Sequence, residues 1–143
     1  SQTLFRTLFD SSPIGTAVSR QADGRFLAIN DAYARLTGYT RSELIGHSSL
    51  DLGLLTPESR RLLIDTVQTQ GYAHGVDLEL VTKSGAAIDI LYAIEGVEVD
   101  GEQCLLSSVI DISERRRMEE ELRRRAAEFE HSRLTLYRML GIA

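Results

Sequence analysis

The stretch GVDLELVTKSGAAIDILYAIEGVEVDGEQCLLSSVIDI, residues 75–112, decides the fold. Apolar and polar residues alternate along it, and a period of two is typical of β-strands that bury one face. Two turn segments, Lys83-Ser84-Gly85 and Asp100-Gly101, interrupt the alternation. The pattern therefore predicts a run of three antiparallel strands at 76–82, 87–99 and 103–112.

The middle strand of this run has two unlike faces. Ile90, Tyr92 and Ile94 share one face, which we expect to line the core, whereas Leu91 and Ala93 lie on the other. An outer face that met only water would need no apolar residues. The sequence therefore predicts that something covers part of the outer face of the sheet.

Upstream of these strands, residues that begin and end helices predict three short helices. Asn30 fits the cap of the first, Thr40-Arg41-Ser42-Glu43 fits a capping box for the second, and Thr56-Pro57 begins the longest. Gly71 ends this last helix. We expect it to direct four apolar residues inward: Leu62, Leu63, Ile64 and Val67.

The first thirty residues predict a helix followed by a β-hairpin. Residues 1–12 form an amphipathic cap helix with four apolar residues on one face: Leu4, Phe5, Leu8 and Phe9. The hairpin strands are expected at 14–20 and 25–29, because Asp23-Gly24 favours a tight turn. The helix is too short to be stable alone, so its apolar face needs a covering surface, on its own sheet or on a partner's.

The last segment predicts a long helix. From Ser113, which we expect to cap it, the chain runs without Gly or Pro to Gly141. Leu122, Phe129 and Leu136 recur every seven residues, the spacing of a coiled-coil seam. Three polar residues occupy seam positions that a strong zipper fills with Ile or Leu: Arg125, Ser132 and Arg133. We therefore expect a marginal two-helix coiled coil and a homodimer.

Charge divides the chain at the same place. The 143 residues carry 16 basic and 21 acidic side chains, a net charge of -5. Residues 1–112 contain 8 basic and 15 acidic side chains, whereas residues 113–143 contain 8 and 6. Because nucleic-acid binding needs a basic surface and glutamates alternate with the arginines of the helix, we expect no nucleic-acid partner and no membrane contact in this segment.

Cysteine content and apolar runs indicate the compartment. Cys104 is the single cysteine, so the sequence offers neither an internal disulfide nor a paired-cysteine zinc site. No run approaches the roughly 20 apolar residues of a membrane span. We therefore expect a cytoplasmic location.

Six short words, in this order, resemble those of the PAS family. They are Leu8-Phe9-Asp10-Ser11-Ser12-Pro13-Ile14-Gly15, Asp23-Gly24 with Asn30-Asp31-Ala32-Tyr33, Leu36-Thr37-Gly38-Tyr39, Glu43-Leu44-Ile45-Gly46, Lys83-Ser84-Gly85 and Asp111-Ile112-Ser113-Glu114-Arg115-Arg116. The last is similar to the segment that ends cytoplasmic bacterial PAS domains and begins their signalling helix. The resemblance implies an α+β fold with a five-stranded antiparallel sheet of order 2-1-5-4-3, helices on one face, a sensory domain at 13–112 and a signalling helix at 113–143.

The resemblance also implies a function. PAS domains sense a ligand, cofactor, light or redox state, or dimerise, and pass the result to an output domain. We expect a non-enzymatic sensory and dimerisation module that signals through its C-terminal helix, most often to a histidine kinase. Two alternatives stay open: a purely structural dimerising connector, and the input module of a diguanylate cyclase or phosphodiesterase. The sequence contains no catalytic motif.

Two cofactor types are disfavoured. PAS proteins that form a flavin-cysteinyl adduct carry Asn-Cys-Arg-Phe-Leu where this chain has Gly46-His47-Ser48-Ser49-Leu50. Haem-binding relatives place a histidine on the long helix, and residues 57–70 contain none. We expect no cofactor and no metal site, and an unidentified small molecule stays open.

A candidate ligand cavity follows from the expected inner faces. Its residues are Tyr33, Leu36, Leu62, Leu63, Val67, Ile90, Tyr92 and Ile94, with Val18 and Ile29 at the sides. One interpretation is that these side chains fill the space to normal density, as any core requires. The other is that Tyr33 or Tyr92 holds a small apolar or amphipathic ligand.

The expected signal junction joins the last strand to the last helix. It consists of Asp111, Ile112, Ser113 and Arg115. The carboxylate of Asp111 can hold the junction through backbone groups or through Arg115. Small shifts of the sheet would then rotate or tilt the paired helices.

Overall fold

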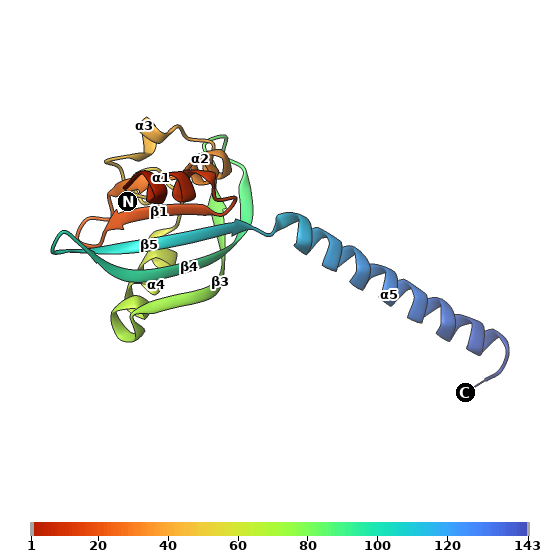
Figure 1. The fold of residues 1–143 in the computed structure, drawn as a ribbon. Helices are drawn as coiled ribbons and strands as arrows, with labels where there is room; N and C mark the ends of the chain where they lie inside the picture. The colour runs from red at the N-terminus through yellow and green to blue at the C-terminus, as the bar shows by residue number, and fades with distance from the viewer. Residues whose placement is uncertain (1, 143) are drawn as a thin grey trace. The chain divides into compact units, whose positions relative to one another are not determined.

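The structure, a computed structural model, describes residues 2–142 (Figure 1). It divides into two compact units, Ser1–Asp111 and Ile112–Ala143. Ser1, the first residue of the predicted cap helix, and Ala143, the last residue of the predicted signalling helix, lie outside the described residues. The elements are α1 (Gln2–Ser11), β1 (Gly15–Arg20), β2 (Phe26–Ile29), α2 (Asp31–Thr37), α3 (Arg41–Leu44), α4 (Pro57–Gln70), β3 (Tyr72–Val81), β4 (Ala87–Val99), β5 (Glu102–Asp111) and α5 (Ser113–Met139).

The five strands form one antiparallel sheet in the order β2-β1-β5-β4-β3, which confirms the expected α+β fold. The last strand in the sequence, β5, lies at the centre of the sheet (Figure 1). Ser107 of β5 is opposite Ala17 of β1 on one side and Ile94 of β4 on the other. Every other part of the sheet is therefore held through β5.

The predicted caps of α2, α3 and α4 are present. The side chain of Asn30 accepts a hydrogen bond from the backbone N–H of Tyr33, and Thr56 does the same from Ser59. Thr40 and Glu43 form both halves of a capping box. These local contacts satisfy backbone donors that the first turn of a helix leaves without partners.

Asn30 also joins three elements of the first unit. Its fully buried amide accepts from the backbone N–H of Thr16 in β1 at 2.9 Å. The same amide donates to the carbonyl oxygens of Phe9 in α1 at 3.0 Å and of Ile14 at 2.9 Å. A buried polar group without a hydrogen-bond partner lowers stability. The hydrogen bonds of Asn30 therefore fix where α1 enters the fold.

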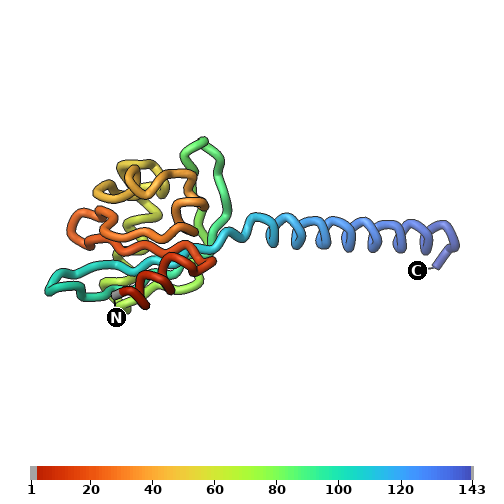
Figure 2. The backbone as a smooth tube through the Cα atoms, turned by 45° about the horizontal axis from the view of Figure 1, so that its top comes forward, coloured from red at the N-terminus to blue at the C-terminus, as the bar shows by residue number. Residues whose placement is uncertain are grey.

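The core lies between the inner face of the sheet and helices α2 to α4. Its fully buried members include Ile29, Tyr33, Leu44, Leu54, Leu80, Ile90 and Val109. In Figures 1 and 2, α1 lies on the opposite side of the sheet from α4. The helices on one face are thus α2 to α4, while α1 is the separate cap helix.

Two side chains predicted to face the core are placed differently. Leu62 is 57% exposed, because Leu63 and Val67, one turn apart, take the inward stripe of α4 and rotate Leu62 away. Val18 belongs to the outer face of β1, since the neighbouring inward positions are Ala17 and Ser19. The expectations for Leu62 and Val18 were therefore wrong.

The second unit is the single helix α5, followed by a short turn. Ile112 is buried, but none of the residues of α5 is. Several ion pairs of α5 join side chains three or four positions apart, such as Arg124 with Glu121 and Glu128. Across residues 2–142, no helix is both long and apolar enough to cross a membrane.

Candidate functional site

Most of the predicted cavity residues come together in the core of the first unit. Tyr33, Leu63, Val67, Ile90, Tyr92 and Ile94 are all buried in one cluster. Leu36 is partly buried and packs against this cluster from α2. Leu62, on the exposed side of α4, does not belong to it.

These side chains nearly fill the space between them. A small cavity of about 20 Å³ lies among them, enough for one water-sized group. It lies between α4, the β1–β2 turn and the inner face of the sheet. Its lining residues are Ser19, Gly24, Phe26, Ser49, Leu55, Arg60, Leu63, Ile64, Tyr92, Ile94, Leu105 and Ser107. Two larger hollows, of about 680 and 550 Å³, are open to the surface.

Polar side chains gather on one wall of this cavity. Tyr92 and Ser107, from the neighbouring strands β4 and β5, share a hydrogen bond. Ser19 of β1 projects from the same face of the sheet. Burial raises the pKa of Tyr92, whereas the hydrogen bond with Ser107 and the positive charge of Arg60 lower it in part. The Tyr92 hydroxyl is therefore protonated at neutral pH and can donate a hydrogen bond.

Tyr33 is the second buried phenol of the core. Burial raises its pKa well above the ordinary value, and the nearby Tyr92 raises it further. Its ring meets Phe26 edge-on, with centroids 5.6 Å apart. Both tyrosines named by the sequence pattern thus stay neutral inside the core.

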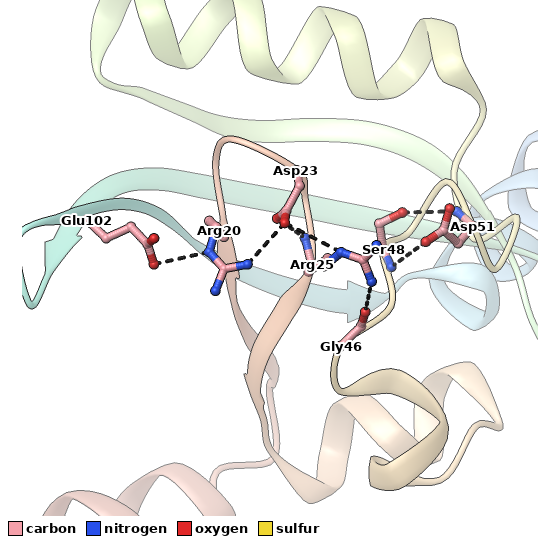
Figure 3. A network of polar contacts seen from close by, with 7 residues as sticks. All are labelled: Arg20, Asp23, Arg25, Gly46, Ser48, Asp51 and Glu102. Atoms are coloured by element: carbon pink, nitrogen blue, oxygen red, sulfur yellow. Dashed lines mark hydrogen bonds and ion pairs between the residues drawn. The ribbon is translucent and has the colours of Figure 1, made fainter.

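A polar network holds the rim of the cavity beside the β1–β2 turn (Figure 3). Asp23 pairs with Arg20 at 3.0 Å and with Arg25 at 3.4 Å. Arg20 also pairs with Glu102 of β5 at 3.1 Å, and Arg25 donates to the carbonyl oxygen of Gly46. The turn is therefore fastened both to the sheet and to the loop after α3.

Ser48 and Asp51 continue this network along the loop (Figure 3). The backbone N–H of Asp51 donates to the Ser48 hydroxyl at 3.0 Å, and the N–H of Ser48 donates to the Asp51 carboxylate at 3.4 Å. Arg25 and Ser48 also form an isolated β-bridge. The loop that carries Ser49 to the cavity is thereby held in one conformation.

The predicted signal junction differs from expectation at the helix cap. Asp111 is the last residue of β5, opposite Ile90 of β4. Ser113 is the first helical residue and not the cap; Ile112 is the cap residue and supplies no side-chain hydrogen bond. The helix begins one residue earlier because the carbonyl oxygen of Ile112 already accepts from Arg116 at 2.9 Å.

Arg115 lies in the first turns of α5 and pairs with Glu119 at 3.0 Å. This contact is local to the helix. The hydrogen bond expected between Asp111 and Arg115 stays a prediction.

The residues predicted to dimerise present apolar surface in both units. In α1, Leu4, Phe5 and Leu8 are exposed, while Phe9 is partly buried and stacks on Phe5 at 5.6 Å. In α5, three residues at seven-residue spacing are exposed: Leu122, Phe129 and Leu136. Dimerisation through either set stays a prediction.

Sequence reasoning missed the polar part of the cavity, namely Ser19, Arg60 and Ser107. None of these three residues was among the predicted cavity residues. Ser107 stands two positions from both Leu105 and Val109, so the period of the strand places it on the core face. Among residues 2–142, no group of His, Cys, Asp and Glu side chains could hold a metal ion.

Comparisons with known proteins agree with this geometry. Residues 3–69 match the family model described as PAS domain. The chain is 26% identical over 129 residues to the sensor histidine kinase TmoS of Ectopseudomonas mendocina. This alignment covers 85% of the chain but only 13% of that kinase.

Solved structures share the fold at low sequence identity. The alignment with an RNA-binding Light-Oxygen-Voltage receptor covers 88% of this chain and 37% of the receptor chain, with a TM-score of 0.72 and 17% identity. The PAS domain of a protein from Colwellia psychrerythraea matches 79% and 98%, with a TM-score of 0.68 and 19% identity. A PAS domain from a two-component sensor histidine kinase matches 77% and 95%, with a TM-score of 0.66 and 14% identity. Taken with the strand order, these likenesses show that the chain has the PAS fold, and residues 3–69 match the PAS family model.

Proposed function

We propose that this PAS domain is a sensory and dimerisation module that passes a signal through α5 to an output domain, which in the parent protein is a histidine kinase. The supporting observation is the position of β5. This strand pairs with β1 and β4 at the centre of the sheet and is followed after one residue by α5. A shift anywhere in the sheet must move β5, and β5 is covalently joined to the helix.

The choice of a histidine kinase is supported by the similarity to a sensor histidine kinase along most of this chain. That kinase is much longer than this chain, so its catalytic domains have no counterpart here. The input module would itself perform no chemistry. It would act by changing the arrangement of two α5 helices.

Dimerisation is supported by the exposed apolar stripe of α5. Leu122, Phe129 and Leu136 are exposed to water on α5. Covering these side chains with a second copy of the helix lowers the free energy. Polar residues in the seam keep this gain small. Two helix arrangements can then lie close in energy, which a signalling dimer requires.

A fusion protein tests the proposal. Residues 1–143 are joined to a histidine kinase core in the natural direction, and autophosphorylation is measured with and without cell extract fractions. We expect the fusion to respond and the Asp111→Ala variant to lose most of the response while folding normally by circular dichroism. A Glu79→Ala variant, changed at an exposed position of the edge strand β3, is the control. An unchanged response in the Asp111→Ala fusion would contradict a role for the junction.

A structural connector is the second candidate, and the small size of the cavity favours it. Such a connector would dimerise but bind nothing. Native mass spectrometry of the purified protein, with an absorption spectrum, separates the two: a bound small molecule rules out the connector, and an empty dimer rules against a ligand carried through purification.

A further inference from the structure

Arg60 is the one charged residue that lines the internal cavity. It lies in the first turns of α4 and is only partly exposed. Among residues 2–142, it takes part in no ion pair, although the unit that contains it carries an excess of acidic side chains. A partly buried cation without a counter-ion is unfavourable, so its position calls for an explanation.

The nearest turn does not supply the missing counter-ion. Asp23 lies beside Gly24 at the rim of the cavity, but Arg20 and Arg25 already engage its carboxylate (Figure 3). The backbone N–H of Arg25 donates to the same carboxylate at 3.0 Å. Asp23 is therefore committed to the turn.

Hydrogen-bond donors surround the space that Arg60 faces. The hydroxyls of Tyr92, Ser107 and Ser19 come from three adjacent strands, and the other lining side chains are apolar apart from Ser49. No carboxylate lines the cavity in the described part of the chain. A cation without a counter-ion, beside hydroxyls that are able to donate, favours an anion that carries oxygen atoms.

We propose that Arg60 makes this cavity selective for a small organic monocarboxylate, bound between the guanidinium of Arg60 and the hydroxyls of Tyr92 and Ser107. The proposal rests on the sensory function proposed above and names its ligand class. The apolar side chains of Leu63, Ile94 and Leu105 would contact the short tail of the ligand.

Arg60 also lies against the β1–β2 turn. A methyl group at Gly24 would collide with Nη2 of Arg60, so the guanidinium rests directly on the backbone of the β1–β2 turn. The free cavity holds one water-sized group, and a carboxylate needs more room. Binding therefore requires the Arg60 side chain to move away from Gly24. This movement couples occupancy to β1, and through β1 to β5.

The test compares carboxylates with neutral molecules of the same shape. Purified residues 1–143 are titrated with sodium acetate or propionate and with acetamide or propionamide, at ionic strength matched with sodium chloride. Amide chemical shifts in NMR report binding and its location. We expect propionate to bind at least about tenfold more tightly than propionamide, because a carboxylate gains charge-assisted hydrogen bonds. Shifts should be centred on residues 19, 24, 60 and 107.

Matched variants locate the charge. Arg60→Gln should lower the affinity for propionate by about tenfold or more and abolish the preference over propionamide, whereas Arg60→Lys should retain part of it. Arg61→Gln removes the adjacent, exposed arginine of the same helix and should change nothing. Ser107→Ala should weaken binding by a smaller factor.

Equal binding of propionate and propionamide, or binding of neither, would overturn the proposal. So would an equal loss in Arg60→Gln and Arg61→Gln. If the kinase fusion responds while no carboxylate binds, the ligand class is wrong and the sensory function stands. If propionate binds but leaves the fusion unchanged, the signalling function fails and the binding site stands.

Discussion

The two units of this chain are stabilised in opposite ways. In the first, contacts join residues far apart in sequence: Asn30 holds α1 and β1, and Lys83 reaches Glu43 at 2.7 Å. In α5, ion pairs join exposed neighbours, where water screens the charges and each pair contributes little to stability. Long-range contacts therefore hold the first unit together, whereas α5 leaves its apolar stripe of Leu122, Phe129 and Leu136 exposed.

The largest expected effect concerns the core of the first unit. Leu63→Ala removes a side chain that is 2% exposed and should lower the free energy of unfolding by about 3 kcal/mol. Leu62→Ala, one residue away on the exposed side of α4, should change it by less than about 0.5 kcal/mol. Urea unfolding followed by circular dichroism measures both. Equal losses of stability in the two variants would mean that α4 turns a different face toward the core.

A smaller effect is expected in α5. Leu136→Ala should weaken the dimer by about 1 kcal/mol, or roughly fivefold in Kd, because part of a leucine leaves the seam. Leu134→Ala is the matched control, since this leucine is similarly exposed but lies off the seven-residue stripe. Analytical ultracentrifugation measures both constants. A wild-type monomer at micromolar concentration would refute the coiled coil.

The smallest effect is an exposed charge contact within the first unit. The hydrogen bond from Lys83, followed by that from the Thr40 backbone, lowers the pKa of Glu43 from 4.5 to about 2. Because folding favours the ionised form, this contribution is complete above pH 4.5 and is lost as the pH falls through about 2. The small stability difference between wild type and Glu43→Gln should therefore shrink with acid.

A double-mutant cycle isolates this contact. In a Lys83→Met background, Glu43→Gln should have less effect at neutral pH than in the wild type. Urea melts at several pH values supply the data. An unchanged difference in the Lys83→Met background would show that Thr40 alone holds Glu43.

Residues that act locally made most of the fold predictable. Asn30, Thr40 and Thr56 mark helix starts because a cap needs only its own next turn. The strand order came from the resemblance to PAS domains, since periodicity alone does not tell which strands are neighbours. The orientation of α4 was harder to predict, because three apolar residues in a row, 62–64, leave the inward face ambiguous.

The polar side of the cavity was the least predictable part. Ser19, Arg60 and Ser107 come from three segments far apart in sequence, and none belongs to a recognisable motif. Their chemistry exists only once β1, β5 and α4 lie together. The helix cap at 112 was misassigned for a related reason: a serine next to a helix start resembles a cap whether or not its side chain serves as one.

The central position of β5 also constrains how the protein is made. The β1–β2 hairpin and the β3–β4 pair have no hydrogen bonds to each other, since β5 separates them in the sheet. During synthesis, the sheet cannot close until residues 102–111 have left the ribosome. Before then, β1 and β4 present open edges that other chains can pair with. The nascent chain therefore stays vulnerable to aggregation until nearly all of the domain has been translated.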